Sequence, residues 1–167
     1  GKSTIANGLK SKGYEIINMG DAVREEAKKR NIEPSSQNLG KIMLELREKN
    51  GPGAVAELIQ NKIKNSSSNV IVIDGIRSNE EIQGLRKFGT VKLLLIDASS
   101  DTRFKFLHER GRSDDPKTRE LFYERDKREI GVGLGGSIAS ADKTISNSNL
   151  TKEELIEKAY NTIQSWT

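Results

Sequence analysis

The sequence predicts an α/β fold in which helices cover both faces of a parallel sheet, giving three layers. Short runs of β-branched and apolar residues alternate along the chain with longer helical patterns, which is the order typical of this class. Two of the runs, Val70–Asp74 and Val91–Asp97, are largely apolar, as expected for strands covered on both sides. Because 167 residues can bury one sizeable core, we expect a single domain over residues 1–167.

The expected elements follow from these patterns. Strands are expected at Tyr14–Asn18, Val70–Asp74, Val91–Asp97 and, from a weaker pattern, Lys143–Ser146. Helices are expected at Thr4–Ser11, Ala22–Arg30, Ser36–Lys49, Val55–Asn65, Glu80–Lys87, Ser100–Arg110, Thr118–Glu129 and Lys152–Trp166. Thr151 and Glu154 have the spacing of a capping box, which marks the start of the last helix.

One glycine-rich stretch, Gly131–Gly136, is superficially similar to a dinucleotide-binding loop. It lacks the preceding strand and the spacing that such a loop requires, so we reject that interpretation. We expect instead a flexible return of the chain from the preceding helix.

Composition excludes several classes of function. The chain has no cysteine, so disulfides, thiol catalysis and cysteine-ligated metals are excluded, and its one histidine, His108, argues against a histidine metal cage. The apolar runs are too short to cross a bilayer and no signal-peptide pattern is visible, so we expect a cytoplasmic protein. The net charge of +4 would attract phosphates, but it does not separate a nucleotide from a nucleic acid or from an ordinary solvated surface.

The first residues carry a phosphate-binding pattern. Gly1-Lys2-Ser3-Thr4 is the second half of G-x-x-x-x-G-K-[ST], followed directly by an amphipathic helical run. Glycine lets the backbone approach phosphates, and the free amides at a helix start bind anions. Lys2 would reach the β- and γ-phosphates, and Ser3 would ligate Mg²⁺.

An acidic residue, Asp74, ends the apolar strand that begins at Val70. Ligands of open α/β sheets bind at the carboxyl ends of the strands, so this carboxylate is placed to hold Mg²⁺ directly or through water. The alternative is an ordinary turn residue in an Asp-Gly pair.

Three further segments resemble motifs of the adenylate kinase group of P-loop phosphotransferases. They are Gly20-Asp21-Ala22-Val23-Arg24, Asp74-Gly75-Ile76-Arg77 and Arg112-Ser113-Asp114-Asp115 followed by Arg125. The resemblance implies that Arg24 and Arg77 grip the acceptor phosphate. It also implies that Arg112 and Arg125, with the neighbouring Arg110, neutralise the phosphoryl group in transfer. Asp21 would orient Arg24 or cap the following helix, and Asp114 and Asp115 would brace the arginines.

Two departures from that group are visible. Arg110 and Arg112 are separated by one residue, which leaves no room for a long lid domain, and the proline of the D-G-F-P-R motif is absent from Asp74–Arg77. The stretch Ala141–Asn147 resembles instead the A-D-x-x-I-x-N segment of dephospho-coenzyme A kinases, in which the position of Asn147 borders the ATP base. The combination most resembles an archaeal group of short adenylate-kinase-related proteins.

These resemblances imply an ATP- and Mg²⁺-dependent phosphotransferase. Gly1–Thr4 and Asp74 would hold ATP·Mg²⁺, an acceptor-binding helical insert would span about residues 20–65, and a short lid would span about residues 110–128. The expected partner is a nucleotide-like small molecule, with no membrane and no nucleic acid, and the oligomeric state stays open. One alternative is a dephospho-coenzyme A kinase, whose hydroxyl acceptor requires a general base such as Asp21. Another is a P-loop ATPase or nucleotide sensor that acts with RNA or protein.

The position of the phosphate-binding pattern carries one more expectation. In P-loop proteins a central strand and the first half of the loop precede the Gly-Lys pair. We expect that both are missing from the printed chain, and that this chain is destabilised and catalytically impaired without them.

Overall fold

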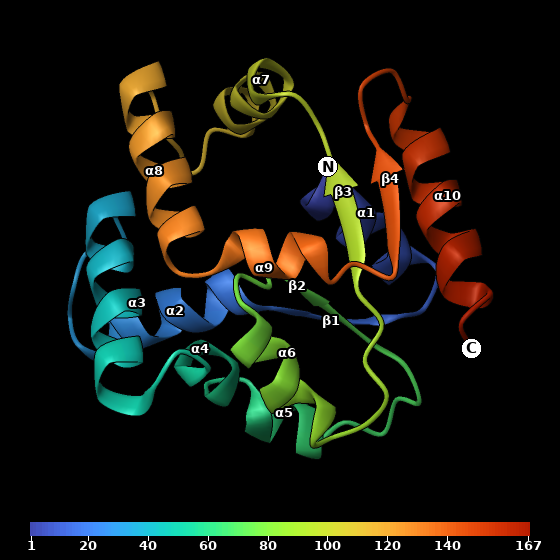
Figure 1. Ribbon diagram of the computed structural model, residues 1–167, viewed down its shortest axis with the longest axis horizontal. Helices are drawn as coiled ribbons and strands as arrows, with labels where there is room; N and C mark the ends of the chain where they lie inside the picture. Colours follow the sequence, from blue (N-terminus) through green and yellow to red (C-terminus); the bar gives the residue numbers. More distant parts are fainter.

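The computed structural model describes residues 1–167 and contains four parallel-paired strands surrounded by helices (Figure 1). Strand β1 (Glu15–Asn18) pairs with β2 (Ile71–Asp74), and β3 (Leu94–Asp97) pairs with β4 (Lys143–Ser146). The predicted α/β class with parallel strands is confirmed. Three of the strands begin one to three residues later than predicted, and no hydrogen-bonded ladder joins the two pairs.

Ten helices accompany the strands. They are α1 (Lys2–Ser11), α2 (Met19–Lys29), α3 (Ser36–Asn50), α4 (Ala54–Glu57), α5 (Gln60–Lys64), α6 (Asn79–Arg86), α7 (Ser100–Arg110), α8 (Arg119–Gly131), α9 (Leu134–Ala139) and α10 (Lys152–Gln164). The capping box of α10 is present as predicted. The predicted helix over Val55–Asn65 is interrupted around Leu58 and Ile59, which separate α4 from α5.

The prediction of a flexible return at Gly131–Gly136 is wrong, because helix α9 begins there at Leu134. Gly133 precedes it with a φ of 106°, in the left-handed region that glycine adopts at little cost. A Cβ at this position would lie 3.3 Å from the Cβ of Ser78, so the chain also passes closely over the start of α6. Gly133 therefore turns the chain and fixes the start of α9.

Two hydrophobic cores hold the elements together. The larger core joins α2, α3 and α4 to β1, with Met19, Ala27, Ile42 and Ile59 almost wholly buried. The second core joins α1 to α10 and to the strands, and Leu9 is fully buried in it. These packings fix the positions of α1 and α2, which both contribute residues to the site described below.

None of the helices combines the length and the apolar character that a membrane crossing would require.

Candidate active site

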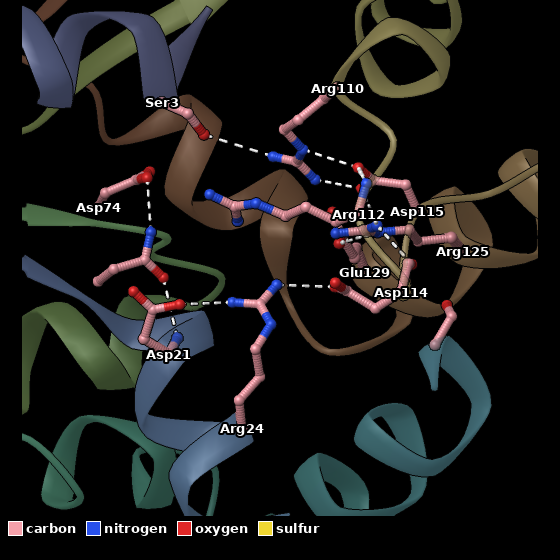
Figure 2. A network of polar contacts seen from close by, with 12 residues as sticks. Ser3, Asp21, Arg24, Asp74, Arg110, Arg112, Asp114, Asp115, Arg125 and Glu129 are labelled. Carbon is pink, nitrogen blue, oxygen red and sulfur yellow. Dashed lines mark hydrogen bonds and ion pairs between the residues drawn. The ribbon is translucent and has the colours of Figure 1, made fainter. Parts of the chain in front are cut away.

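The predicted site residues come together from four separate parts of the chain (Figure 2). Arg110, at the end of α7, donates a hydrogen bond to the hydroxyl of Ser3 in α1 (3.3 Å). Arg24 of α2 forms an ion pair with Asp114 in the turn between α7 and α8 (2.8 Å). These two contacts link the first helix, the α2 start and the α7–α8 turn around one space.

The start of α1 provides the first wall of this space. No side chain caps the helix and its first turn holds no acidic residue, so its amides are available to an anion. Asn147, which follows β4, lies beside this start: a Cβ on Gly1 would approach its Nδ2 to 2.7 Å. Thr4 is half-buried in the first turn.

Lys2 adds a cation to this wall. Lys2 is exposed at the surface, yet the charges of Arg77 and Arg125 act on its ammonium group. Desolvation is the largest cause that lowers the pKa of Lys2, and the charge of Arg77 lowers it further. The opposite charges on Asp74 and Glu129 offset part of this effect. A bound anion would offset the rest, because it favours the protonated form.

Asp74 lies at the carboxyl end of β2, as predicted, and only 9% of it is exposed. One of its carboxylate oxygens accepts a hydrogen bond from Nδ2 of Asn18 (2.9 Å), the residue beside it on β1. The other oxygen is buried and has no hydrogen-bond partner. A buried carboxylate oxygen without a partner is costly unless a cation or a donor completes it.

That open oxygen and the hydroxyl of Ser3 fit a Mg²⁺ site of the P-loop type. No group of three or more acidic or histidine side chains could enclose a metal alone. Mg²⁺ bound beside phosphates needs no such cage, because it keeps several waters and takes oxygens from the phosphates. A hydroxyl and one carboxylate are the kinds of ligand that such an ion takes from a P-loop protein.

Asp21 and Arg24 form a pair at the start of α2. Arg24 Nη1 donates to Asp21 Oδ1 at 2.7 Å, while the other oxygen of Asp21 has no partner. The alternative role of Asp21 as the helix cap is wrong, because α2 starts at Met19 and its cap is Asn18. The Asn18 side chain accepts from the Asp21 amide (3.0 Å). Asn18 thus both caps α2 and holds Asp74.

The turn between α7 and α8 is organised by Asp115. Its carboxylate accepts two hydrogen bonds from Arg110 and one from the amide of Arg112 (2.9 Å), and its side chain is 3% exposed. Burial by itself would raise the pKa of Asp115, but the hydrogen bonds from Arg110 and from the Arg112 amide outweigh it and hold the pKa below its usual range. The turn is therefore a rigid support for Arg110.

Asp114 and Asp115 serve different arginines. Asp115 braces Arg110 and lies 3.7 Å from Arg125, as expected. The Asp114 side chain binds Arg24 on α2 instead, and its backbone oxygen faces Arg125 (3.4 Å). The acidic pair thus ties the α7–α8 turn to the predicted acceptor side of the site.

Arg112 is the one arginine of the predicted set whose guanidinium has no protein partner. Its side chain takes part in no hydrogen bond or ion pair, and the residue is exposed. In Figure 2 the side chain extends toward the space between Ser3 and Asp74. A free guanidinium in this position is available for bidentate binding of phosphate oxygens.

Arg77 and Arg125 meet at a residue that the sequence analysis did not select, Glu129. Arg77 Nη2 lies 3.1 Å from its carboxylate, and Arg125 Nε donates to the same oxygen at 3.2 Å. The available signal was the spacing of Arg125 and Glu129, four residues apart on one helix face. That spacing is equally common in surface ion pairs. Asn18 was missed too, although a polar residue between a strand and a helix is a typical cap.

The charges of the site nearly balance. Six cations face five carboxylates; the cations are Lys2, Arg24, Arg77, Arg110, Arg112 and Arg125, and the carboxylates are Asp21, Asp74, Asp114, Asp115 and Glu129. Most of the arginines are thus neutralised by acids in this state. Lys2 and Arg112 have no carboxylate partner and can bind a polyanion directly. The other arginines can bind it when phosphate oxygens replace the carboxylates that now pair with them.

An open pocket of about 700 Å³ continues the space beyond Arg24, along α2 and the loop that follows it. It is lined by Asp21, Arg24, Glu25, Lys28, Asn31, Ile32, Glu33 and Pro34.

The chain is similar to known proteins over most of its length. Residues 1–121 match the family model described as "AAA domain". A UPF0200 protein of Pyrococcus abyssi is 42% identical over 154 residues, which cover 89% of this chain and 82% of the relative. A UPF0200 protein of Pyrococcus horikoshii is 42% identical over 173 residues, covering 99% and 92%. One of Hyperthermus butylicus is 40% identical over 159 residues, covering 95% and 85%.

Proposed function

The chain belongs to the UPF0200 proteins and to the AAA domain family of P-loop nucleotide-binding folds, and we propose that it is an ATP-dependent phosphotransferase with a nucleotide-like acceptor. One observation carries the proposal. Arginines from the α7–α8 region approach the start of α1, where Arg110 contacts Ser3, while Arg24 and Arg77 supply cations from two other elements. A site with cations on both sides of the phosphate-binding start suits two anionic substrates better than one.

The chain's own groups account for the chemistry. Phosphoryl transfer requires an in-line arrangement and cations around the migrating group, with little covalent work by the protein. The amides of the α1 start and Lys2 would bind the triphosphate, and Arg110, Arg112 and Arg125 would bind the oxygens of the phosphoryl group in transfer. Mg²⁺, when bound by Ser3 and Asp74, neutralises charge on the phosphate oxygens.

The acceptor would enter from the other side. Arg24 lines the open pocket, which has room for the rest of the molecule, and Arg77 would reach the acceptor phosphate from the loop after β2. A phosphate acceptor would replace the carboxylate of Asp114 on Arg24, since both bind the same guanidinium edge. The α2–α5 region would then be the acceptor-binding part.

A hydroxyl acceptor such as dephospho-coenzyme A is the second candidate. One oxygen of Asp21 accepts from Arg24, and the other is free and solvent-accessible, since the side chain is 58% exposed. A carboxylate held by an arginine with one free oxygen can accept the proton of an attacking hydroxyl. A phosphate acceptor needs no such base.

The experiment is an acceptor panel with ATP and Mg²⁺, read by mass spectrometry of the products. AMP, CMP, dTMP and dephospho-coenzyme A are offered separately, with an Asp21→Asn variant beside the wild type. Phosphorylation of a monophosphate that survives Asp21→Asn supports the first candidate. Phosphorylation of dephospho-coenzyme A that Asp21→Asn abolishes supports the second. Steady ATP hydrolysis with no phosphorylated acceptor contradicts both and supports an ATPase.

A further inference from the structure

Glu129 occupies an unusual place for an acidic side chain. It lies near the carboxyl end of α8, which ends at Gly131, and its side chain is 18% exposed. The carboxyl end of a helix carries partial negative charge, and burial further disfavours an ionised carboxylate. An acid in this position needs compensation from nearby cations.

The compensating cations come from three elements of the site. Glu129 contacts Arg77, after β2, and Arg125, on α8, at 3.1 and 3.2 Å from one oxygen. Lys2 of α1 is close enough for its charge to act on the same carboxylate. Burial raises the pKa of Glu129, but the charges of Arg77, Arg125 and Lys2 together lower it below its usual range. The carboxylate is thus ionised; it contacts two of these cations and attracts the third, Lys2, and without it the three would repel one another.

The same three cations are those proposed above to bind substrate phosphates. A carboxylate and a phosphate present similar oxygens to a guanidinium, so one can replace the other. We propose that Glu129 is a positioning residue whose carboxylate holds Arg77 and Arg125 together until a substrate phosphate takes its place. The inference rests on the proposed phosphate-binding role of the site and adds the internal anion that the substrate must displace.

The structure separates this exchangeable carboxylate from a fixed one. Asp115 accepts two hydrogen bonds from Arg110 and a third from a backbone amide, and is 3% exposed. Glu129 makes single, longer contacts with two different arginines and keeps some exposed surface. Charge-assisted pairs are strongest near 2.7–2.9 Å, so the contacts of Glu129 are the weaker ones. Glu129 can therefore leave while Asp115 keeps the turn in place.

Binding of inorganic tripolyphosphate, measured by calorimetry without metal, tests the proposal. Glu129→Gln removes the competing carboxylate. The affinity of this variant for tripolyphosphate should therefore be about tenfold higher than that of the wild type. Glu129→Asp keeps the charge and should stay near the wild type. The matched control is Asp126→Asn, which removes one negative charge from the same helix but breaks a pair with Arg103 on α7. Its affinity should change by less than about threefold.

A gain for Glu129→Gln no larger than that of Asp126→Asn would overturn the proposal, and so would a loss of affinity. A purely structural role would lower the affinity, because the arginines would scatter. If Glu129→Gln does not fold, carboxyl-carbon NMR of the wild type decides instead. Tripolyphosphate should shift the Glu129 resonance and leave that of Asp126 unchanged; an unmoved Glu129 resonance would overturn the proposal.

The two proposals fail separately. If tripolyphosphate displaces Glu129 but the protein phosphorylates no acceptor, the proposal for Glu129 holds and the proposed transferase activity is contradicted. An active transferase in which Glu129 is not displaced would do the reverse.

Discussion

At the scale of residues, the polar groups that lack a hydrogen-bond or ion-pair partner define the chemistry of the site. One oxygen of Asp74 is buried without a partner, and the guanidinium of Arg112 is free. Every other cation of the set except Lys2 is already paired with a carboxylate. Since the exposed guanidinium of Arg112 makes no contact that stabilises the folded state, its replacement should change function more than stability.

Arg112→Met tests this expectation. An arginine that binds the phosphoryl group in transfer contributes about 10³-fold or more to the rate in related P-loop systems. We therefore expect a loss of about that size in kcat, with an unchanged melting temperature because no ion pair is broken. Steady-state kinetics with the acceptor found in the panel and thermal unfolding measure the two effects.

The matched control for this variant is Arg119→Met. Arg119 is the first residue of α8 and pairs at the surface with Asp101 (2.7 Å); the two side chains are 51% and 81% exposed. It should keep the wild-type rate. An Arg112→Met variant that retains more than about a third of the wild-type rate would contradict the assignment of Arg112.

At the scale of elements, a buried ion pair fixes the position of the loop after β2. Glu81 of α6 accepts from the Arg77 amide (2.7 Å) and pairs with Arg47 of α3 (2.6 Å). Glu81 is fully buried and Arg47 is 8% exposed, and two nitrogens of Arg47 have no partner. The pair fixes where Arg77 leaves the sheet and connects α3 to the site.

Glu81→Gln should destabilise the protein by about 3–5 kcal/mol, because it leaves the Arg47 charge buried without a counterion. Urea unfolding monitored by circular dichroism gives this free energy. Glu45→Gln is the control, since Glu45 pairs with Arg30 at the surface and is 53% exposed. It should cost no more than about 1 kcal/mol. If the two substitutions lower the free energy of unfolding equally, the buried pair matters no more to stability than a surface pair, and the prediction is contradicted.

Pattern and spacing predicted the strands and most helices, because their apolar residues repeat with the period of the element. The helix α9 was missed, since its glycines have low helical propensity and its start depends on the contact of Gly133 with Ser78 across the chain. The break between α4 and α5 also has no local signal. Tertiary contacts decide both.

The candidate site was predictable to the same degree. Motif resemblance selected Ser3, Arg24, Asp74 and Arg110, and the structure brings these into one network. It could not select Glu129, whose partner Arg77 is 52 residues away in the chain. Such a contact is fixed by how the fold brings α8 and the loop after β2 together, not by spacing along the sequence.

At the scale of the whole molecule, the site connects α1, which packs in the second core, with α2, which packs in the larger core, through Arg110 and Asp114. Ion pairs from Asp114, Asp115 and Glu129 join α2, α7, α8 and the loop after β2. Two of these acids, Asp115 and Glu129, have a pKa below the usual range. The stability of the molecule should therefore depend on their ionisation.

The sign of that dependence is fixed by the lowered pKa. Unfolded Asp and Glu titrate near pH 4, and the folded groups titrate lower, so their contribution is complete above about pH 4.5 and is lost as the pH falls through the folded values. Asp115→Asn should be less stable than the wild type at pH 7, and the difference should shrink below about pH 4. Urea unfolding from pH 3 to pH 7 measures it. A difference that stays constant with pH would contradict the lowered pKa of Asp115.

The central claim is that a triphosphate binds at the start of α1 and shares its Mg²⁺ with Asp74. A crystal structure of the protein with Mg²⁺ and a nonhydrolysable ATP analogue tests it most directly. We predict phosphates on the amides of Gly1–Thr4, Mg²⁺ on Ser3 and on the Asp74 oxygen that now lacks a partner, and the Arg112 guanidinium on the γ-phosphate. A triphosphate bound elsewhere, with Asp74 touching neither phosphate nor metal, would contradict it.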